Sequence, residues 1–565
     1  MSLRFALSAR RRAGVDVALI ALVGIVLVLM SNHSAWAAGG SSLGGESFTG
    51  SATTTPNWFL PTSEGGVTIV NTACLTASAD VSATPIPGCS GTAVDAGGSG
   101  VLRLTTNATN QVGTVYSTVT VPTSKGVDIK FVSYQWSKNA GRLQAGDGVA
   151  LVLAATDPAN PRPPAVLAAN GGALGYASNG TIAGVSYGYL GLGLDVYGNF
   201  SYVGYGHSCP GANEITGTNS QVSNSSYILA TANSVTVRGP GNGTTGYCEM
   251  PTTADTGNAY LAGYSTSRVA SGSLLDAPNA TSRPGSVPVE IAINSDSMPA
   301  ITGSGLSVPA RSWLVSVTPL GGVAQQMTGA LPTAAELLAV GYPASWISPT
   351  TGLPQRLSFG FSASTGGSAE YHEVANQSIA TLDGPLPSYA VTVTDNPSGS
   401  LTRAAHAIAS ITSSLTSAGG SEAEATTVTT TFPAAFTPPS TTFSTAAGYV
   451  CTPAAQVVTC LYMPTAAVPA GTAYPALLIP FTVSTASNAG TYTITTTVSS
   501  ADGAAASAAH SIDVIDPVTK ASGPTLAMTG QDDGAALLPL GGGGTLVGIA
   551  LLLGSQRLRR RARSR

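Results

Sequence analysis

Apolar and polar residues alternate along most of this chain, which predicts β-strands rather than helices. In residues 356–364, "RLSFGFSAS", every second side chain after the first is apolar, and those between are small or polar. Residues 148–155, "GVALVLAA", instead form a continuous apolar run, as expected for a strand covered on both faces. Glycine-rich turn signals such as "NGGALG" and "STGG" separate these segments. The pattern predicts an all-β sandwich of two antiparallel sheets over residues 47–383.

A second region of alternation covers residues 385–516. "SYAVTVTD" at 388–395 and "TYTITTTVSS" at 491–500 both place apolar side chains on one face and hydroxyls on the other. The region is rich in Thr, Pro and Ala and predicts a single immunoglobulin-like β-sandwich stalk. It is similar to the sandwich modules found near the anchors of bacterial surface proteins. The alternative is a weakly ordered linker of the same composition.

Both ends of the chain carry apolar runs of a different kind. Arg4 and the arginines at 10–12 precede an unbroken apolar stretch at 17–30, and "AWA" at 35–37 has the small residues that a signal peptidase requires. This order predicts a signal peptide over residues 1–37, cleaved after Ala37. The alternative is an uncleaved membrane anchor, for which the apolar run is short.

The C-terminal segment has three parts. After a linker at 517–525, the pentapeptide "LAMTG" at 526–530 precedes an apolar stretch at 535–554, and the chain ends in an arginine-rich tail. The apolar stretch of about 20 residues is long enough to form a transmembrane helix. The arginines would keep the tail on the cytoplasmic side of the membrane.

This three-part segment, residues 526–565, resembles a sortase sorting signal of the LAxTG type, which is typical of high-GC Gram-positive bacteria. The resemblance implies that a sortase cuts between Thr529 and Gly530 and joins the threonine to peptidoglycan. We therefore expect an extracellular protein fixed to the cell wall, which spans the membrane only before sorting. A simple C-terminal membrane anchor is the alternative.

The composition limits the remaining functions. Charged residues make up 9% of the 565 residues and the net charge is −4, so nucleic acid is not an expected partner. The 67 glycines and 36 prolines disfavour long helices. The six cysteines have no CxxC spacing, so we expect no zinc site. In an exported chain, disulfides between sequence neighbours are expected, because each pair lies within one loop or hairpin. The predicted bridges are Cys74–Cys89, Cys209–Cys248 and Cys451–Cys460.

Several segments of the first region resemble the L-type (legume-like, concanavalin A-like) lectin domain of bacterial surface proteins. They occur in the order that the family shows, and they cover most of residues 47–383. The family implies a jelly-roll sandwich that binds carbohydrate. The segments are "AGDGVALVL", "NGGALGYA", "YLGLGLDVYGNFS" and "LSFGFSASTGGSAEYHEVANQSI", with "ACLTA…PGC" and "NSVTVRGPGNGTTGY" as further elements.

The resemblance also implies a carbohydrate-binding site. Asp147, Gly171, Gly172 and Asn199 match the family's aspartate, glycine-loop amide and asparagine. A carboxylate can accept hydrogen bonds from two sugar hydroxyls, and glycine lets the backbone approach closely.

The family's metal pattern is incomplete in this chain. Asp195, the Tyr197 carbonyl and Asn199 retain the spacing of calcium ligands. The position of the transition-metal glutamate is Gly193, and the segment after Asn199 lacks the second aspartate. We expect the two-metal site to be lost. Either one calcium ion remains, or Asp195 and Asn199 hydrogen-bond a loop.

Two functions are consistent with these patterns. One is a wall-anchored adhesin that binds carbohydrate; the other is a structural spacer whose lectin-like domain no longer does so. A glycan-processing enzyme is a third and weaker hypothesis, because glycoside hydrolysis needs two carboxylates and the matching strand carries only Asp195. His372 and Glu373 are interpreted as structural contacts, and no catalytic residue is predicted.

Overall fold

The computed structural model describes most of the chain between its two ends. The described residues are 40–62, 70–140, 144–202, 205–206, 232–250, 266–268, 272–276, 279–283 and 285–517. The predicted signal peptide, sorting signal, apolar stretch and arginine-rich tail lie outside them. Within the described part of the chain, no helix has the length and hydropathy to cross a membrane.

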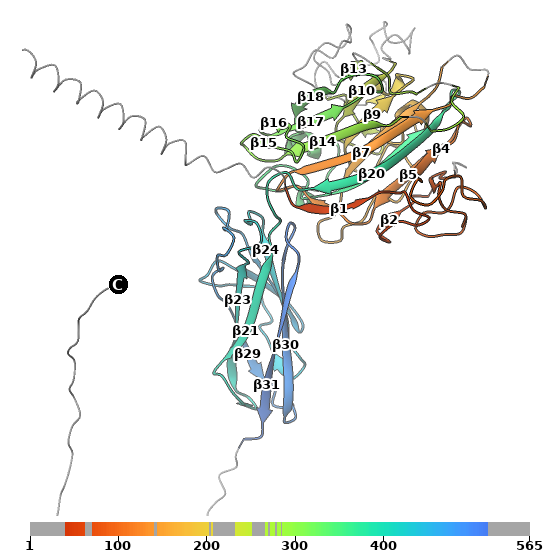
Figure 1. Cartoon of the computed structure of the whole chain (residues 1–565). Coiled ribbons are helices and arrows are strands. Elements are labelled where there is room, and N and C mark those ends of the chain that lie inside the picture. Colours follow the sequence, from red (N-terminus) through yellow and green to blue (C-terminus); the bar gives the residue numbers. More distant parts are fainter. Residues whose placement is uncertain are drawn as a thin grey trace, which may run out of the picture. The chain divides into compact units, whose positions relative to one another are not determined.

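The first sandwich contains an eight-stranded antiparallel sheet with the central order β17-β14-β7-β20-β4 (Figure 1). β1 pairs with the part of β20 that does not pair with β4. The strands are β1 (Ser42–Glu46), β3 (Cys74–Leu75), β4 (Leu102–Thr105), β7 (Val127–Trp136), β14 (Val287–Asn294), β17 (Ser312–Val317), β18 (Gln325–Ala330) and β20 (Tyr371–Ala380).

The opposing sheet has ten strands, with the central order β9-β8-β19-β5. β8 pairs with β9 on one side and with β19 on the other, both antiparallel. The strands are β2 (Trp58–Phe59), β5 (Val112–Ser117), β6 (Val121–Pro122), β8 (Gly148–Ala155), β9 (Gly188–Asp195), β10 (Ser234–Arg238), β11 (Gly241–Asn242), β12 (Thr245–Gly246), β13 (Thr266–Arg268) and β19 (Arg356–Ser364).

The ten-stranded sheet is covered on both faces. Val149, Leu151 and Leu153 of β8 belong to the main core between the two sheets. The intervening Ala150 and Val152 face a smaller core, built with residues of the loops that follow β8 and β9. The continuous apolar run of β8 is therefore explained, as predicted, by burial on both sides.

The small core, defined here as the second apolar cluster of the first sandwich, lies under the loops that carry the predicted binding residues. Its members are fully or nearly fully buried. They are Tyr116, Ala150, Val152, Ala154, Ala168, Ala169, Ala173, Leu174, Tyr176, Ala177, Val185, Phe200 and Tyr247.

Residues 389–515 form a second two-sheet sandwich with its own core. This region is a packed sandwich rather than the weakly ordered linker considered above. One sheet contains β21 (Tyr389–Asn396), β23 (His406–Leu415), β25 (Phe436–Thr437) and β29 (Leu477–Val483). The other contains β22 (Leu401–Thr402), β24 (Thr426–Thr431), β26 (Phe443–Ser444), β27 (Val450–Ala454), β28 (Val457–Tyr462), β30 (Gly490–Ser500) and β31 (Ala506–Ile515).

Short elements connect the strands of the first sandwich. β15 (Ala300–Ile301) and β16 (Ser307–Val308) form a hairpin. The helix α2 (Ala334–Ala339) begins with a capping box, in which Thr333 and Glu336 exchange hydrogen bonds with each other's backbone. The 3₁₀ turns are η1 (Gly171–Ala173), η2 (Asn199–Ser201) and η5 (Ala344–Trp346). The all-β class predicted from the alternation is confirmed.

Two of the predicted disulfides are present among the described residues. Cys74–Cys89 closes a loop beside β3, and Cys451–Cys460 joins directly paired residues of the β27–β28 hairpin. Cys248 is also disulfide-bonded. Its predicted partner, Cys209, lies outside the described residues.

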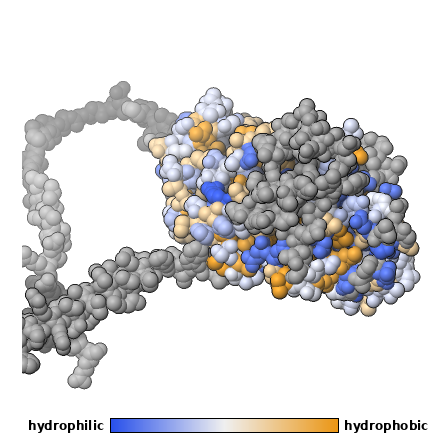
Figure 2. Space-filling view, turned by 90° about the horizontal axis from the view of Figure 1, so that it is seen from above, coloured by the Kyte–Doolittle hydropathy of each residue, from blue (hydrophilic) through white to orange (hydrophobic). Residues whose placement is uncertain are grey.

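The described surface mixes residue types. On the face seen in Figure 2, hydrophilic and hydrophobic residues are interspersed. The large apolar side chains that are most exposed, such as Val70 and Val323, lie far apart in the sequence. Single exposed apolar residues of this kind are ordinary on a protein surface.

Candidate carbohydrate-binding site

The site begins where β8 starts and β9 ends. Gly148 of β8 pairs with Asp195 of β9, so the residues just outside this pair meet at one edge of the sheet. The carbonyl of Asp147 accepts hydrogen bonds from the backbone N–H groups of Val196 and Tyr197, at 3.1 and 3.2 Å. The turn after β9 is therefore fixed against the residue before β8.

The glycine loop reaches the same edge. The hydroxyl of Ser364, at the end of β19, donates to the carbonyl of Gly171 at 2.6 Å. A Cβ atom on Gly172 would lie 2.3 Å from Cγ of Asn199, which leaves room only for glycine. The structure thus brings together all four residues predicted to bind carbohydrate: Asp147, Gly171, Gly172 and Asn199.

Asp147 and Asn199 are joined directly. Nδ2 of Asn199 donates to Oδ1 of Asp147 at 3.2 Å. The other two side-chain oxygens, Oδ2 of Asp147 and Oδ1 of Asn199, are buried and have no hydrogen-bond partner. Asp147 is 4% exposed, whereas Asn199 is partly exposed. Two adjacent buried acceptors without donors are costly to leave unpaired.

The environment of Asp147 changes its ionisation. Burial raises the pKa of the Asp147 carboxyl to about 7. The hydrogen bond from Asn199 and the nearby backbone N–H of Gly366 favour the ionised form and oppose this shift. A donor added by a ligand would act in the same direction and favour the carboxylate.

Asp195 organises the turn rather than facing a ligand. Its Oδ1 accepts from the Gly198 N–H at 2.7 Å, and its Oδ2 accepts from the Phe200 N–H at 2.5 Å. Asp195 is fully buried, and this burial raises the pKa of its carboxyl to about 8. Of the two alternatives for Asp195, a calcium ligand or a hydrogen-bond acceptor for a loop, this geometry matches the second.

The calcium ion implied by the resemblance would be held by Asp195, the Tyr197 carbonyl and Asn199. Both carboxylate oxygens of Asp195 already accept backbone N–H groups. Across the described ranges, no three His, Cys, Asp or Glu residues come together in a way that could hold a metal ion. Calcium prefers six or more oxygen ligands, usually including several carboxylates, so the residues that the structure describes here do not fit this ion.

A third buried acid, Glu370, lies near the site and was not predicted from the sequence. Its Oε1 is 3.1 Å from Nε2 of His372, and its Oε2 has no partner. Burial raises the pKa of Glu370 well above its usual range, and the negative charges of Asp147 and Asp195 add to this effect. The signal available in the sequence was the acid at position 370, at the end of the "STGGSAE" loop, where Gly366 also lies close to Asp147.

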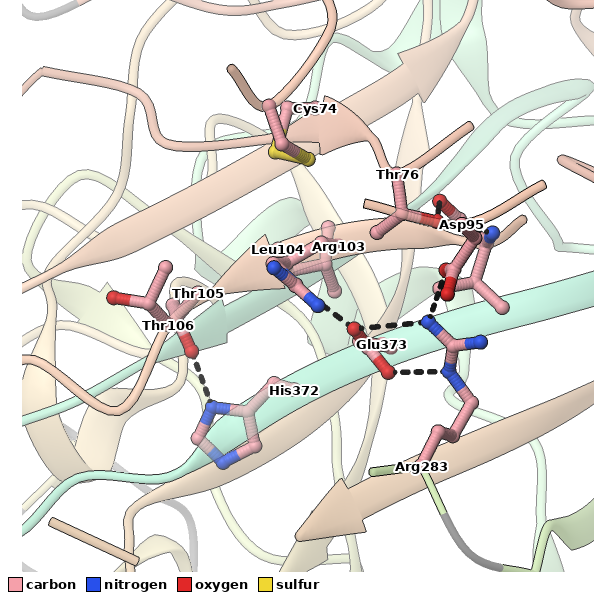
Figure 3. Close-up of polar contacts among 12 residues, drawn as sticks. Cys74, Thr76, Asp95, Arg103, Leu104, Thr105, Thr106, Arg283, His372 and Glu373 are labelled. Carbon is pink, nitrogen blue, oxygen red and sulfur yellow. Dashed lines mark hydrogen bonds and ion pairs between the residues drawn. A yellow bond between two sulfur atoms is a disulfide. The ribbon is translucent and has the colours of Figure 1, made fainter. Parts of the chain in front are cut away.

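His372 and Glu373 are adjacent on β20 but take part in different contacts (Figure 3). Nδ1 of His372 is 2.6 Å from the Thr105 hydroxyl, and burial lowers the pKa of its imidazole to about 3. Glu373 accepts from Arg103 at 2.8 Å and from Arg283 at 2.7 Å. Both side chains are thus engaged in internal contacts, as the interpretation of this pair predicts.

The Glu373 network extends further. Nε1 of Trp136 donates to Oε2 of Glu373 at 2.9 Å. Arg283 also donates to Asp95 at 2.7 Å (Figure 3). Two guanidinium groups therefore balance two carboxylates. The network joins β20 and β4 to the segments that carry Asp95 and Arg283, so its evident role is to hold those segments in place.

Comparisons with known proteins give structural likenesses only. No protein-family model matches the sequence, and no curated protein matches it. The VIP36 exoplasmic/lumenal domain bound to Ca²⁺ and Man3GlcNAc is 15% identical, covering 50% of this chain and 78% of its own, with a TM-score of 0.25. Metal-free lectin I-B4 from Griffonia simplicifolia is 12% identical (50% and 87%; TM-score 0.26). Basic winged bean lectin with Tn-antigen is 13% identical (57% and 96%; TM-score 0.27). The fold described above therefore rests on the chain's own strands and their register.

Proposed function

We propose that the first sandwich binds carbohydrate at the site formed by Asp147, the Gly171–Gly172 loop and Asn199. The observation that carries this proposal is the pair of buried acceptors, Oδ2 of Asp147 and Oδ1 of Asn199, which have no partners. Two neighbouring hydroxyl groups of one sugar ring can supply two donors. A bound sugar would satisfy both acceptors at once.

The strength expected of such a site is modest. A hydrogen bond to a charged group contributes about 1.5–3 kcal/mol, before the cost of removing water from the sugar. With one carboxylate and one amide as the main contacts, we expect millimolar to micromolar dissociation constants. Display of many copies on one surface would strengthen attachment without any new contact.

A glycan array followed by calorimetry on residues 38–520 tests this function. Asp147→Asn removes the charge at nearly constant shape, and Asn199→Ala removes the second acceptor. Both variants should reduce affinity at least tenfold, on the basis of about 1.4 kcal/mol or more per lost contact. Asp80→Asn, in an exposed loop beside Cys89, is the matched control and should bind normally. A blank array for the unchanged protein would instead favour the spacer function.

We further propose that the protein is exported and joined to the wall of a Gram-positive bacterium, where it acts as an adhesin. The support is the order of signal peptide, LAMTG, apolar stretch and arginine-rich tail in the sequence. A sortase and peptidoglycan would be its partners during attachment. The second sandwich, over residues 385–516, would serve as a stalk that carries the binding site away from the wall.

A further inference from the structure

Arg238 is a fully buried cation at the end of β10. Its Nε donates to the carbonyl of Phe200 at 2.8 Å, and its Nη2 donates to the carbonyl of Tyr202 at 2.6 Å. Its Nη1 donates to the carbonyl of Tyr247, also at 2.6 Å. One guanidinium group thus binds three backbone carbonyls, two of them in the segment that follows Asn199.

The same segment is held from its other side by Asp195. The Phe200 peptide donates its N–H to Asp195, and its carbonyl accepts from Arg238. Gly198 on the opposite side of Asn199 also donates to Asp195. Asn199 therefore lies between two residues whose backbone groups are fixed by a buried acid, and one of these is fixed by the buried cation as well.

The register of the sheet produces this arrangement. β10 pairs with β9 so that Ser234 is opposite Asp195 and Arg238 is opposite Gly191. The guanidinium then lies 5.2 Å from the Phe200 ring centroid and 5.9 Å from that of Tyr205. Arg238 is thus enclosed by the small core, where carbonyl oxygens and aromatic faces are the groups that stabilise a positive charge.

We infer that Arg238 is the cation that organises the Asn199 turn in this chain, in place of the calcium ion, so that the turn and its ligand binding are independent of calcium. Arg238 is a positioning residue, since it acts on the site through the backbone of Phe200 and Tyr202. Its effect on binding rests on the carbohydrate-binding function proposed above, whereas its effect on the turn does not.

The charges around Arg238 support this role. Burial lowers the pKa of the Arg238 guanidinium, and the negative charges of Glu249 and Asp195 oppose that shift. Arginine stays protonated at physiological pH even when it is buried. The Arg238 guanidinium therefore provides a permanent positive charge near Asp195. Its N–H donors already point at the backbone carbonyls of the turn.

The first experiment uses the unchanged protein. Melting temperature and the hydrogen exchange of the Gly198 and Phe200 amides are measured in 5 mM calcium and in 5 mM EDTA. A protein ordered by Arg238 should melt within about 1 °C in both conditions, because a bound ion would raise the melting temperature by mass action. A higher melting temperature in calcium, with slower exchange at these two amides, would overturn the inference.

The second experiment removes the three N–H donors of the Arg238 guanidinium. Arg238→Met should speed exchange of the Gly198 and Phe200 amides about tenfold or more relative to the rest of the sandwich. Arg238→Lys keeps the charge but cannot reach three carbonyls at once, so it should give an intermediate rate. Arg103→Met is the matched control, because it removes a buried guanidinium from the opposite sheet. Equal exchange at these amides in Arg238→Met and Arg103→Met would contradict the inference.

The outcomes remain separable from those of the proposed function. If no glycan binds but the exchange pattern is as expected, the carbohydrate-binding function fails and the role of Arg238 in the turn stands. If Arg238→Met does not fold, the comparison between the unchanged protein and Arg238→Lys decides. Glycan affinity that is lost in EDTA and restored by calcium would also overturn the inference.

Discussion

At the scale of single residues, burial of Asp147 makes stability depend on pH. The pKa of this carboxyl is raised to about 7 in the fold, against 3.8 when it is exposed. Between these pH values the folded state binds more protons than the unfolded state, so stability is greatest at low pH and falls as pH rises through this window. The contribution is on the order of 4 kcal/mol. We expect the urea midpoint of the unchanged protein to fall between pH 5 and 7.5, and that of Asp147→Asn to fall less.

The same carboxyl predicts how glycan affinity varies with pH. Hydroxyl donors favour the ionised form of Asp147, so binding lowers its pKa and releases a proton below about pH 7. Affinity should therefore rise up to tenfold per pH unit from pH 5 towards 7 and then level off. Calorimetry in two buffers of different ionisation enthalpy measures the released proton directly. Binding that is flat across this range would mean that Asp147 does not contact the ligand.

Glu373 provides a stability prediction at the opposite sheet. Its fully buried carboxylate accepts from Arg103, Arg283 and Trp136, so Glu373→Gln leaves Arg103 without an anion and Arg283 with Asp95 alone. We expect a loss of about 3–5 kcal/mol in the free energy of unfolding. Urea unfolding followed by tryptophan fluorescence measures it. Asp513→Asn, which is exposed on β31, should change stability by less than about 0.5 kcal/mol. A similar small change in Glu373→Gln would show that the network is not structural.

The sequence allowed some of the site residues to be predicted and not others. Asp147, Gly172 and Asn199 lie beside strand ends in short segments that resemble a known family. Their meeting at one edge then follows from antiparallel pairing of β8 with β9 and β19. Glu370 and Arg238 were missed because nothing local marks a lone charge as buried. Their burial depends on loops that are distant in the sequence, and the hydrophobic pattern around each residue does not reveal those contacts.

At the scale of elements, strands with strict alternation were predictable because one face of each is buried. β30 shows this directly, because Ile494, Thr496 and Val498 are buried and the residues between them are more exposed. β19 alternates in sequence although both of its faces are buried, because small and polar residues occupy one of them. The small core was not predictable in the same way. Its residues come from β8 and from irregular loops around Ala169, Tyr176 and Phe200, where no period exists to indicate which side chains turn inward.

The β27–β28 hairpin gives a prediction for one element. Cys451 and Cys460 are direct register partners, both fully buried, nine residues apart. Replacing both by alanine should lower the free energy of unfolding by about 2–3 kcal/mol, because the unfolded chain gains conformational freedom without the bridge. The lost packing of the two buried sulfur atoms adds a further cost. All five tryptophans precede residue 347, so tryptophan fluorescence follows only the first sandwich. We expect the circular dichroism transition to shift to lower temperature, and the fluorescence transition to stay unchanged. A shift of both transitions together would show that the two sandwiches unfold as one unit.

At the scale of the whole molecule, the proposed anchoring can be tested on the intact cell. Thr529→Ala removes the residue that would be joined to peptidoglycan, so the protein should move from the muramidase-released wall fraction to the membrane or the medium. Met528→Ala is the matched control, since the middle position of the LAxTG pattern is variable, and it should remain attached. Covalent attachment of Thr529→Ala would rule out sorting at this threonine.

The second apolar layer on the ten-stranded sheet has an evolutionary consequence. The loops that carry the proposed site contribute Ala173, Leu174 and Phe200 to the small core, while the main core packs on the other face of the same sheet. Mutations in these loops therefore disturb a small, local set of contacts and leave the sandwich itself intact. Lineages of this protein could diversify what they recognise on other surfaces while keeping one inherited scaffold, and a library of loop variants built on this chain should remain folded.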